Sequence, residues 1–143
     1  MLSVSFVFCA VVALAKAQAV CPAAWTKYNK QCFYYDGTSW TWVEAQARCQ
    51  SFGGNLASVH SDEEYAFIQT LTQVPTWLGG TDCQRTGAWF WIDGTPMMYR
   101  IWCLLKPDND LKQCCLQMNT GENKCWDDAT CSTTLPYVCA RPL

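Results

Sequence analysis

The sequence contains a single histidine, His60, and lacks a glycine-rich phosphate-binding loop. A catalytic nucleophile needs an activating base and a group that orients it, and His60 has no evident partner serine or free cysteine. Asp127 and Asp128 are adjacent, and neighbouring residues on a strand face opposite sides of a sheet, so a paired acid and base is not indicated. We therefore expect no enzymatic activity and no cofactor.

Positive charge is also scarce, with ten Lys and Arg against twelve Asp and Glu. A chain without a basic patch does not suit a phosphate backbone, so we expect no nucleic-acid partner. The apolar run from Leu2 to Leu14 is too short to span a bilayer comfortably, and the small-x-small cleavage signature Ala15-Lys16-Ala17 follows it. We predict a signal peptide over residues 1–17, a secreted mature chain of residues 18–143, and no membrane partner.

Cysteine, in contrast, is abundant, with eleven in the chain. Cys9 leaves with the predicted signal peptide, so an even number remains in what we interpret as one domain. The count leaves the pairing open. The stretch from Trp102 to Cys139 holds six cysteines and several carboxylates. Such a stretch is either a surface loop with solvated charges, stapled by disulfides, or a binding loop held by a rigid scaffold.

The pattern of turns and caps predicts an α+β fold with two helices and antiparallel sheets. A hairpin is expected over Cys21–Tyr35, ended by Asp36-Gly37. One helix starts at the capping box Thr41-x-x-Glu44 and ends at Gly53-Gly54. A second follows Ser61-x-x-Glu64, ends by Pro75 and buries Phe67, Ile68 and Leu71. The expected strands are Trp77–Gly80, Trp89–Ile92, Cys115–Met118, Lys124–Trp126 and Tyr137–Cys139.

Several of these elements together resemble the C-type lectin-like domain, over the whole mature chain from Cys21 to Cys139. The features that carry the resemblance are Cys21-Pro22, the helix ending at Cys49, Trp77-Leu78-Gly79-Gly80, Trp89-x-Trp91, Cys125-Trp126-Asp127-Asp128 and Cys139. The family pattern implies a C-type lectin-like fold. No single feature is specific, but the set is.

Within that family the chain is similar to the type II antifreeze proteins of fish. Trp102-Cys103, the doublet Cys114-Cys115, and Cys125, Cys131 and Cys139 stand at matching spacing. The resemblance implies five disulfides, namely Cys21–Cys32, Cys49–Cys139, Cys83–Cys114, Cys103–Cys125 and Cys115–Cys131.

The chain departs from the calcium site of its sugar-binding relatives. Those relatives use E-P-N or Q-P-D in a long loop, a glutamate before the next cysteine, and W-N-D on a strand, and calcium takes six to eight oxygens. Here Lys106 stands first and supplies donors only. Lys112-Gln113 precedes Cys114, and Asp127 replaces the asparagine. We expect no metal, as in the calcium-independent antifreeze branch.

The resemblance implies a protein that adsorbs to ice and inhibits crystal growth without calcium, and we expect it to be secreted and monomeric. Because a crystal face favours a preorganised surface, we place the ice-binding residues in the clamped loop region. The candidates are Leu104, Leu105, Lys106, Pro107, Asp108, Asn109, Asp110, Asp127, Asp128, Ala129 and Thr130. One alternative is a secreted lectin of innate defence that binds carbohydrate, around a calcium ion or directly, through Asp108, Asn109, Asp127 and Asp128. The other is a lectin-like domain that binds protein through exposed aromatics.

Overall fold

A computed structural model describes residues 20–143. The predicted signal peptide, residues 1–17, lies outside the described residues. The elements are β1 (Thr26–Tyr28), β2 (Gln31–Trp40), α1 (Trp42–Ser51), β3 (Asn55–Leu56), α2 (Asp62–Leu71), β4 (Thr76–Thr81), β5 (Phe90–Trp91), β6 (Cys115–Thr120), β7 (Cys125–Ala129) and β8 (Leu135–Pro142). The predicted α+β class with two helices is confirmed.

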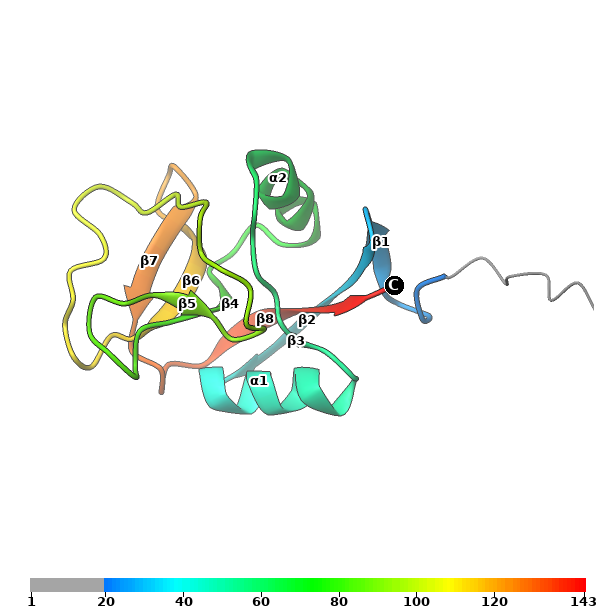
Figure 1. Cartoon of the computed structure of the whole chain (residues 1–143), viewed down its shortest axis with the longest axis horizontal. Helices are drawn as coiled ribbons and strands as arrows, with labels where there is room; N and C mark the ends of the chain where they lie inside the picture. The colour runs from blue at the N-terminus through cyan, green and yellow to red at the C-terminus, as the bar shows by residue number, and fades with distance from the viewer. Residues whose placement is uncertain (1–19) are drawn as a thin grey trace, which may run out of the picture.

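The strands form one connected sheet in the order β1-β2-β8-β4-β6-β7, with β3 on β8 and β5 on β4. Figure 1 shows α1 and α2 on opposite sides of the central strands, with β5, β6 and β7 gathered at one end. The prediction of purely antiparallel sheets is wrong at one place, because β4 and β8 pair in parallel at Trp77 and Tyr137. That pairing joins the half of the sheet that carries the chain ends to the half that carries β6 and β7.

The predicted opening hairpin forms, with its turn at Asn29-Lys30, but Asp36-Gly37 does not end its second strand. β2 runs on to Trp40, with a register shift against β8 after Asp36. The Asp36 carboxylate accepts hydrogen bonds from the N–H (2.9 Å) and the hydroxyl (2.7 Å) of Thr38. This local turn absorbs the extra residues as a bulge, so the strand resumes instead of ending.

Both predicted helices form, and both start at the predicted caps. The capping box of α1 is complete, since Thr41 and Glu44 bond each other's backbone N–H groups. α2 starts after Ser61 and ends at Leu71, before the predicted limit at Pro75. The buried residues of α2 are Tyr65 and Ile68, while Phe67 and Leu71 are partly buried. The sequence pattern missed Tyr65, whose hydroxyl donates to the Lys124 carbonyl at 2.5 Å.

An aromatic cluster supports the end of the sheet that carries the candidate site. Trp126, on β7, is fully buried and lies edge-to-face against Trp91 and Trp102, with ring centroids 5.3 and 5.7 Å away. Its backbone N–H donates to Ile101, and its carbonyl accepts from Cys103. The chain that enters the long loop is therefore fixed to β7 by both backbone and side chains.

The structure contains five disulfides, namely Cys21–Cys32, Cys49–Cys139, Cys83–Cys114, Cys103–Cys125 and Cys115–Cys131. The pairs are those that the family resemblance implies. Three of them hold the segments around β6 and β7. In residues 20–143, no helix has the length and apolar character needed to cross a bilayer.

Candidate functional site

The loop over residues 103–114, hereafter the clamped loop, is held covalently at both ends. Cys103 is bonded to Cys125 at the start of β7, and Cys114 is bonded to Cys83. The next residue, Cys115, is bonded to Cys131 beyond β7. In Figure 1 the segment that includes this loop projects beside β6 and β7. Its conformation is consequently restricted before any ligand arrives.

Short-range hydrogen bonds shape the clamped loop between these anchors. The Lys106 N–H donates to the Cys103 carbonyl at 2.9 Å, and Leu105 has φ 63°. The Lys106–Pro107 peptide bond is cis. Further along, the Asp110 carboxylate accepts from the Lys112 N–H at 2.9 Å. Turns of this kind are formed by Asp and Pro residues, which accounts for the loop's composition.

Lys106 lies between two carboxylates of the site. Its Nζ is 2.9 Å from Asp108 Oδ2 and 3.4 Å from Asp127 Oδ1. The other oxygen of Asp127 accepts from Gln117 Nε2 at 3.1 Å. The hydrogen bond to Asp108, aided by the Asp127 charge, raises the pKa of Lys106. The ammonium therefore links the clamped loop to β7.

Asp128 makes a second link between β7 and the clamped loop. Its carboxylate is 1% exposed and accepts the Asp108 N–H, at 3.2 and 3.4 Å from its two oxygens. Burial, followed by the nearby Asp108 carboxyl, raises the pKa of Asp128 to about 6. The Lys106 hydrogen bond lowers the pKa of Asp108. Although they are neighbours on a strand, Asp127 and Asp128 both contact the loop, one through an ammonium and the other through a backbone N–H.

The structure divides the predicted ice-binding residues into exposed and buried groups. Leu104 and Leu105 are 89% and 87% exposed. Asp108, Asn109, Asp110 and Thr130 are also exposed, and Lys106, Pro107 and Asp127 are intermediate. Asp128 and Ala129 are buried, at 1% and 8% exposed, so they offer little surface to an external ligand. Both residues belong to β7, and the sequence pattern does not show which other segments cover them.

One exposed apolar residue of the clamped loop was missed. Leu111 is 78% exposed and lies next to Asp110. An isolated leucine among polar loop residues is the sequence signal that would have included it. With Leu104 and Leu105 it makes three large apolar side chains exposed on one loop.

The expectation that His60 lacks a partner serine is also wrong. Ser58 Oγ is 2.9 Å from His60 Nε2 and donates to Asp93 Oδ2 at 2.5 Å. The single serine proton thus goes to the carboxylate, and the imidazole must donate to the serine. A nucleophilic serine needs the opposite order, with its proton directed at the imidazole. This cluster ties the Asp93 turn to the chain before α2.

Four cysteine sulfurs, of Cys83, Cys114, Cys115 and Cys131, lie within 4.8 Å of one another. Metal binding needs thiolates, and these four are consumed in two disulfides.

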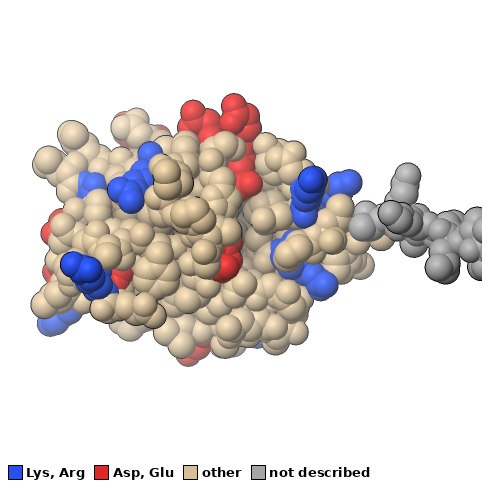
Figure 2. Space-filling view, viewed as in Figure 1, with Lys and Arg blue, Asp and Glu red and all other residues tan. Residues whose placement is uncertain are grey.

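Figure 2 shows charges in small separate groups on one face, with acidic residues gathered over α2. That face carries no broad basic area.

Comparison with known proteins adds to this description. The family model for the lectin C-type domain matches residues 38–141. A type-2 ice-structuring protein of Hemitripterus americanus is 42% identical over 98% of each chain. A calcium-independent type II antifreeze protein has a structure with TM-score 0.83 and 46% identity, over 86% of this chain and 95% of its own. A Ca²⁺-dependent type II antifreeze protein, in its Ca²⁺-free form, has TM-score 0.82 and 43% identity, over 85% and 99%.

Proposed function

The chain belongs to the lectin C-type domain family, and from that premise we propose that it is a secreted antifreeze protein that adsorbs to ice and inhibits crystal growth without calcium. Its similarity to type II ice-structuring proteins over nearly the full length supports ice as the partner. Relatives of both calcium classes match it about equally well. Calcium independence must therefore be argued from the site residues.

The observation that carries the proposal is the position of the Lys106 ammonium. It lies against Asp108 and Asp127, two carboxylates that would otherwise repel each other. A divalent cation would neutralise such a pair in a calcium site. Lys106 supplies a positive charge at this place and no oxygen ligand. We infer that the ammonium neutralises these carboxylates as a calcium ion would. The loop is therefore formed in the absence of calcium.

The clamped loop has the properties that adsorption to a crystal face requires. Its two ends are fixed by disulfides, and its middle is fixed by Lys106 and by the bond from Asp108 to Asp128. A surface that is already ordered loses little conformational entropy on binding. Leu104, Leu105 and Leu111 provide exposed apolar area on the same loop. We propose that the exposed residues of this loop, together with Thr130, contact ice, and that the protein acts as a monomer.

Incorporation into a growing ice hemisphere tests the proposed face. The double variant Leu104→Asn/Leu105→Asn removes two exposed apolar side chains from the loop. The matched control, Val20→Asn/Val74→Asn, removes two from elsewhere, 79% and 49% exposed. We expect the control to enter ice like the wild type and the loop variant to be largely excluded, with no change in unfolding temperature. Equal incorporation of both variants would remove the loop from the ice-binding face.

The lectin alternative fits the site less well. Sugar binding through calcium in this family uses an oxygen ligand where Lys106 stands, and a glutamate before the next cysteine, where the uncharged Gln113 stands. The ammonium occupies the neighbourhood of the carboxylates that would share the ion. We therefore propose adsorption to ice, without catalysis, in preference to calcium-mediated binding of carbohydrate.

A further inference from the structure

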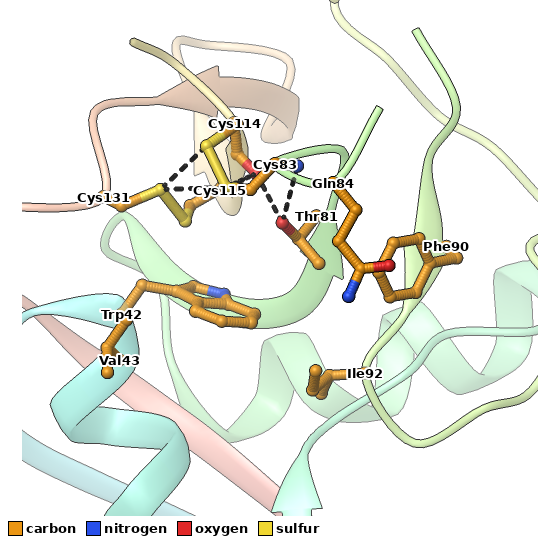
Figure 3. Close-up of a pocket in the computed structure, with 10 residues that line it drawn as sticks. All are labelled: Trp42, Val43, Thr81, Cys83, Gln84, Phe90, Ile92, Cys114, Cys115 and Cys131. Carbon is orange, nitrogen blue, oxygen red and sulfur yellow. Dashed lines mark hydrogen bonds between the residues drawn. A yellow bond between two sulfur atoms is a disulfide. The ribbon is translucent and has the colours of Figure 1, made fainter. Parts of the chain in front are cut away.

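A pocket that meets the clamped loop only at Cys114 opens where α1, β4, β5 and the ends of β6 and β7 meet. Its volume is about 310 Å³. Figure 3 shows Trp42 and Val43 from α1 on one side, Phe90 and Ile92 on the other, and the two adjacent disulfides above. None of the residues that line it is among the proposed ice-binding residues.

The walls of this pocket are fixed before a ligand enters. The Trp42 indole N–H donates to the Leu78 carbonyl at 2.8 Å, and the Trp42 backbone N–H donates to the Cys131 carbonyl at 3.1 Å. The two disulfides touch, with Cys114 Sγ 3.5 Å from Cys131 Sγ. A preformed pocket binds without the cost of ordering its own side chains.

The lining is uncharged and offers little to water. The Thr81 hydroxyl is already engaged, because it donates to the Cys114 carbonyl at 2.8 Å and accepts from the Cys83 N–H at 3.1 Å. The Gln84 carboxamide, beside the Phe90 ring, has no hydrogen-bond partner among the lining residues (Figure 3). Apart from this carboxamide, water here finds few partners, so an apolar group gains free energy by displacing poorly bonded water.

Size and chemistry together define the ligand. An apolar cavity of about 150 Å³ holds benzene, so twice that volume suits two fused rings. Sulfur makes favourable contacts with aromatic rings, and two disulfides form one wall. We propose that this pocket binds a neutral aromatic molecule of one or two rings that carries one hydroxyl or carbonyl group, which bonds to the Gln84 carboxamide.

The test is a titration of the oxidised mature protein with 2-naphthol, followed by the amide chemical shifts of Val43, Gln84 and Ile92. A ligand of this size in a preformed apolar pocket is expected to saturate with Kd of about 1 mM or lower. 2-Naphthalenesulfonate has the same rings and a charge, and is expected to bind at least about tenfold more weakly, because the pocket offers the charge no partner.

Two matched variants locate the binding. Val43 is 66% exposed at the mouth, so Val43→Trp narrows the entrance without disturbing the core and is expected to weaken 2-naphthol binding at least about tenfold. Val74→Trp adds the same indole at a remote, 49% exposed position and is expected to leave binding unchanged. The proposal is overturned by the absence of saturable shifts, by equal affinity for the sulfonate, or by wild-type affinity in Val43→Trp.

Discussion

Replacing Asp128 with asparagine should make the protein more stable at neutral pH. Asp128 is buried, and its ordinary pKa of 3.8 is raised to about 6 by desolvation and by the neighbouring Asp108 carboxyl. The folded state therefore holds this proton more tightly than the unfolded state. Between pH 3.8 and about 6, the stability that Asp128 contributes falls as the pH rises. This contribution is fully present below pH 3.8 and is lost above about pH 6.

The size of the effect follows from the difference between the two pKa values. Each pKa unit corresponds to about 1.4 kcal/mol, so the buried carboxylate costs at most about 3 kcal/mol at pH 7.5. Asparagine keeps an oxygen that can accept the Asp108 N–H and carries no charge. Asp128→Asn is thus expected to unfold with a free energy 1 to 3 kcal/mol higher than the wild type at pH 7.5, as an order-of-magnitude range, and about equal at pH 3.

Urea unfolding of the oxidised protein at pH 3, 5 and 7.5 measures this difference. Other carboxylates titrate in the same range, so the informative quantity is the free energy of Asp128→Asn minus that of the wild type at each pH. Glu122→Gln is the control, because Glu122 is an exposed turn residue and its replacement removes one negative charge without uncovering a buried group. A difference independent of pH, or a destabilised Asp128→Asn at pH 7.5, would refute the reasoning.

Two further predictions concern the clamped loop and the disulfides. Lys106→Met keeps the side-chain length and removes the charge that holds Asp108 and Asp127, so amide exchange from Leu104 to Asp110 should become faster and thermal hysteresis should fall. Lys112 is an exposed lysine of the same loop, and Lys112→Met should leave amide exchange and thermal hysteresis unchanged. Equal behaviour of the two variants would show that Lys106 has no special role in ordering the loop. Thiol titration of denatured, unreduced mature protein should find essentially no free thiol, because all ten cysteines from Cys21 to Cys139 are paired; two or more per chain would contradict the pairing.

Local chemistry made the helices predictable. Thr41 and Ser61 cap α1 and α2 through their own side chains, a relation confined to four residues and therefore visible in the sequence. The disulfide pairing was available only through the family resemblance, since the number of cysteines allows many arrangements. The extension of β2 past Asp36-Gly37 could not be predicted from the local sequence, because the bulge depends on a partner strand about a hundred residues away.

The missed features of the site all depend on contacts between distant segments. Asp128 and Ala129 are both buried although they are adjacent on β7, and only the three-dimensional arrangement shows that they are covered. Asp93 meets Ser58 from 35 residues away, so His60 looked isolated in the sequence. Lys106, Asp108 and Asp127, in contrast, all stand at positions of the family's calcium site, so the resemblance implies that they lie close together. The distances of 2.9 and 3.4 Å agree with that hypothesis.

The most direct test of the central claim is thermal hysteresis of the purified mature protein, measured with excess calcium and again with a chelator. Lys106 stands where a calcium ligand would have to be, so we expect equal hysteresis and the same crystal habit in both solutions. Loss of activity in the chelator, restored by added calcium, would contradict the role assigned to Lys106. Absence of hysteresis in both solutions would contradict ice binding itself.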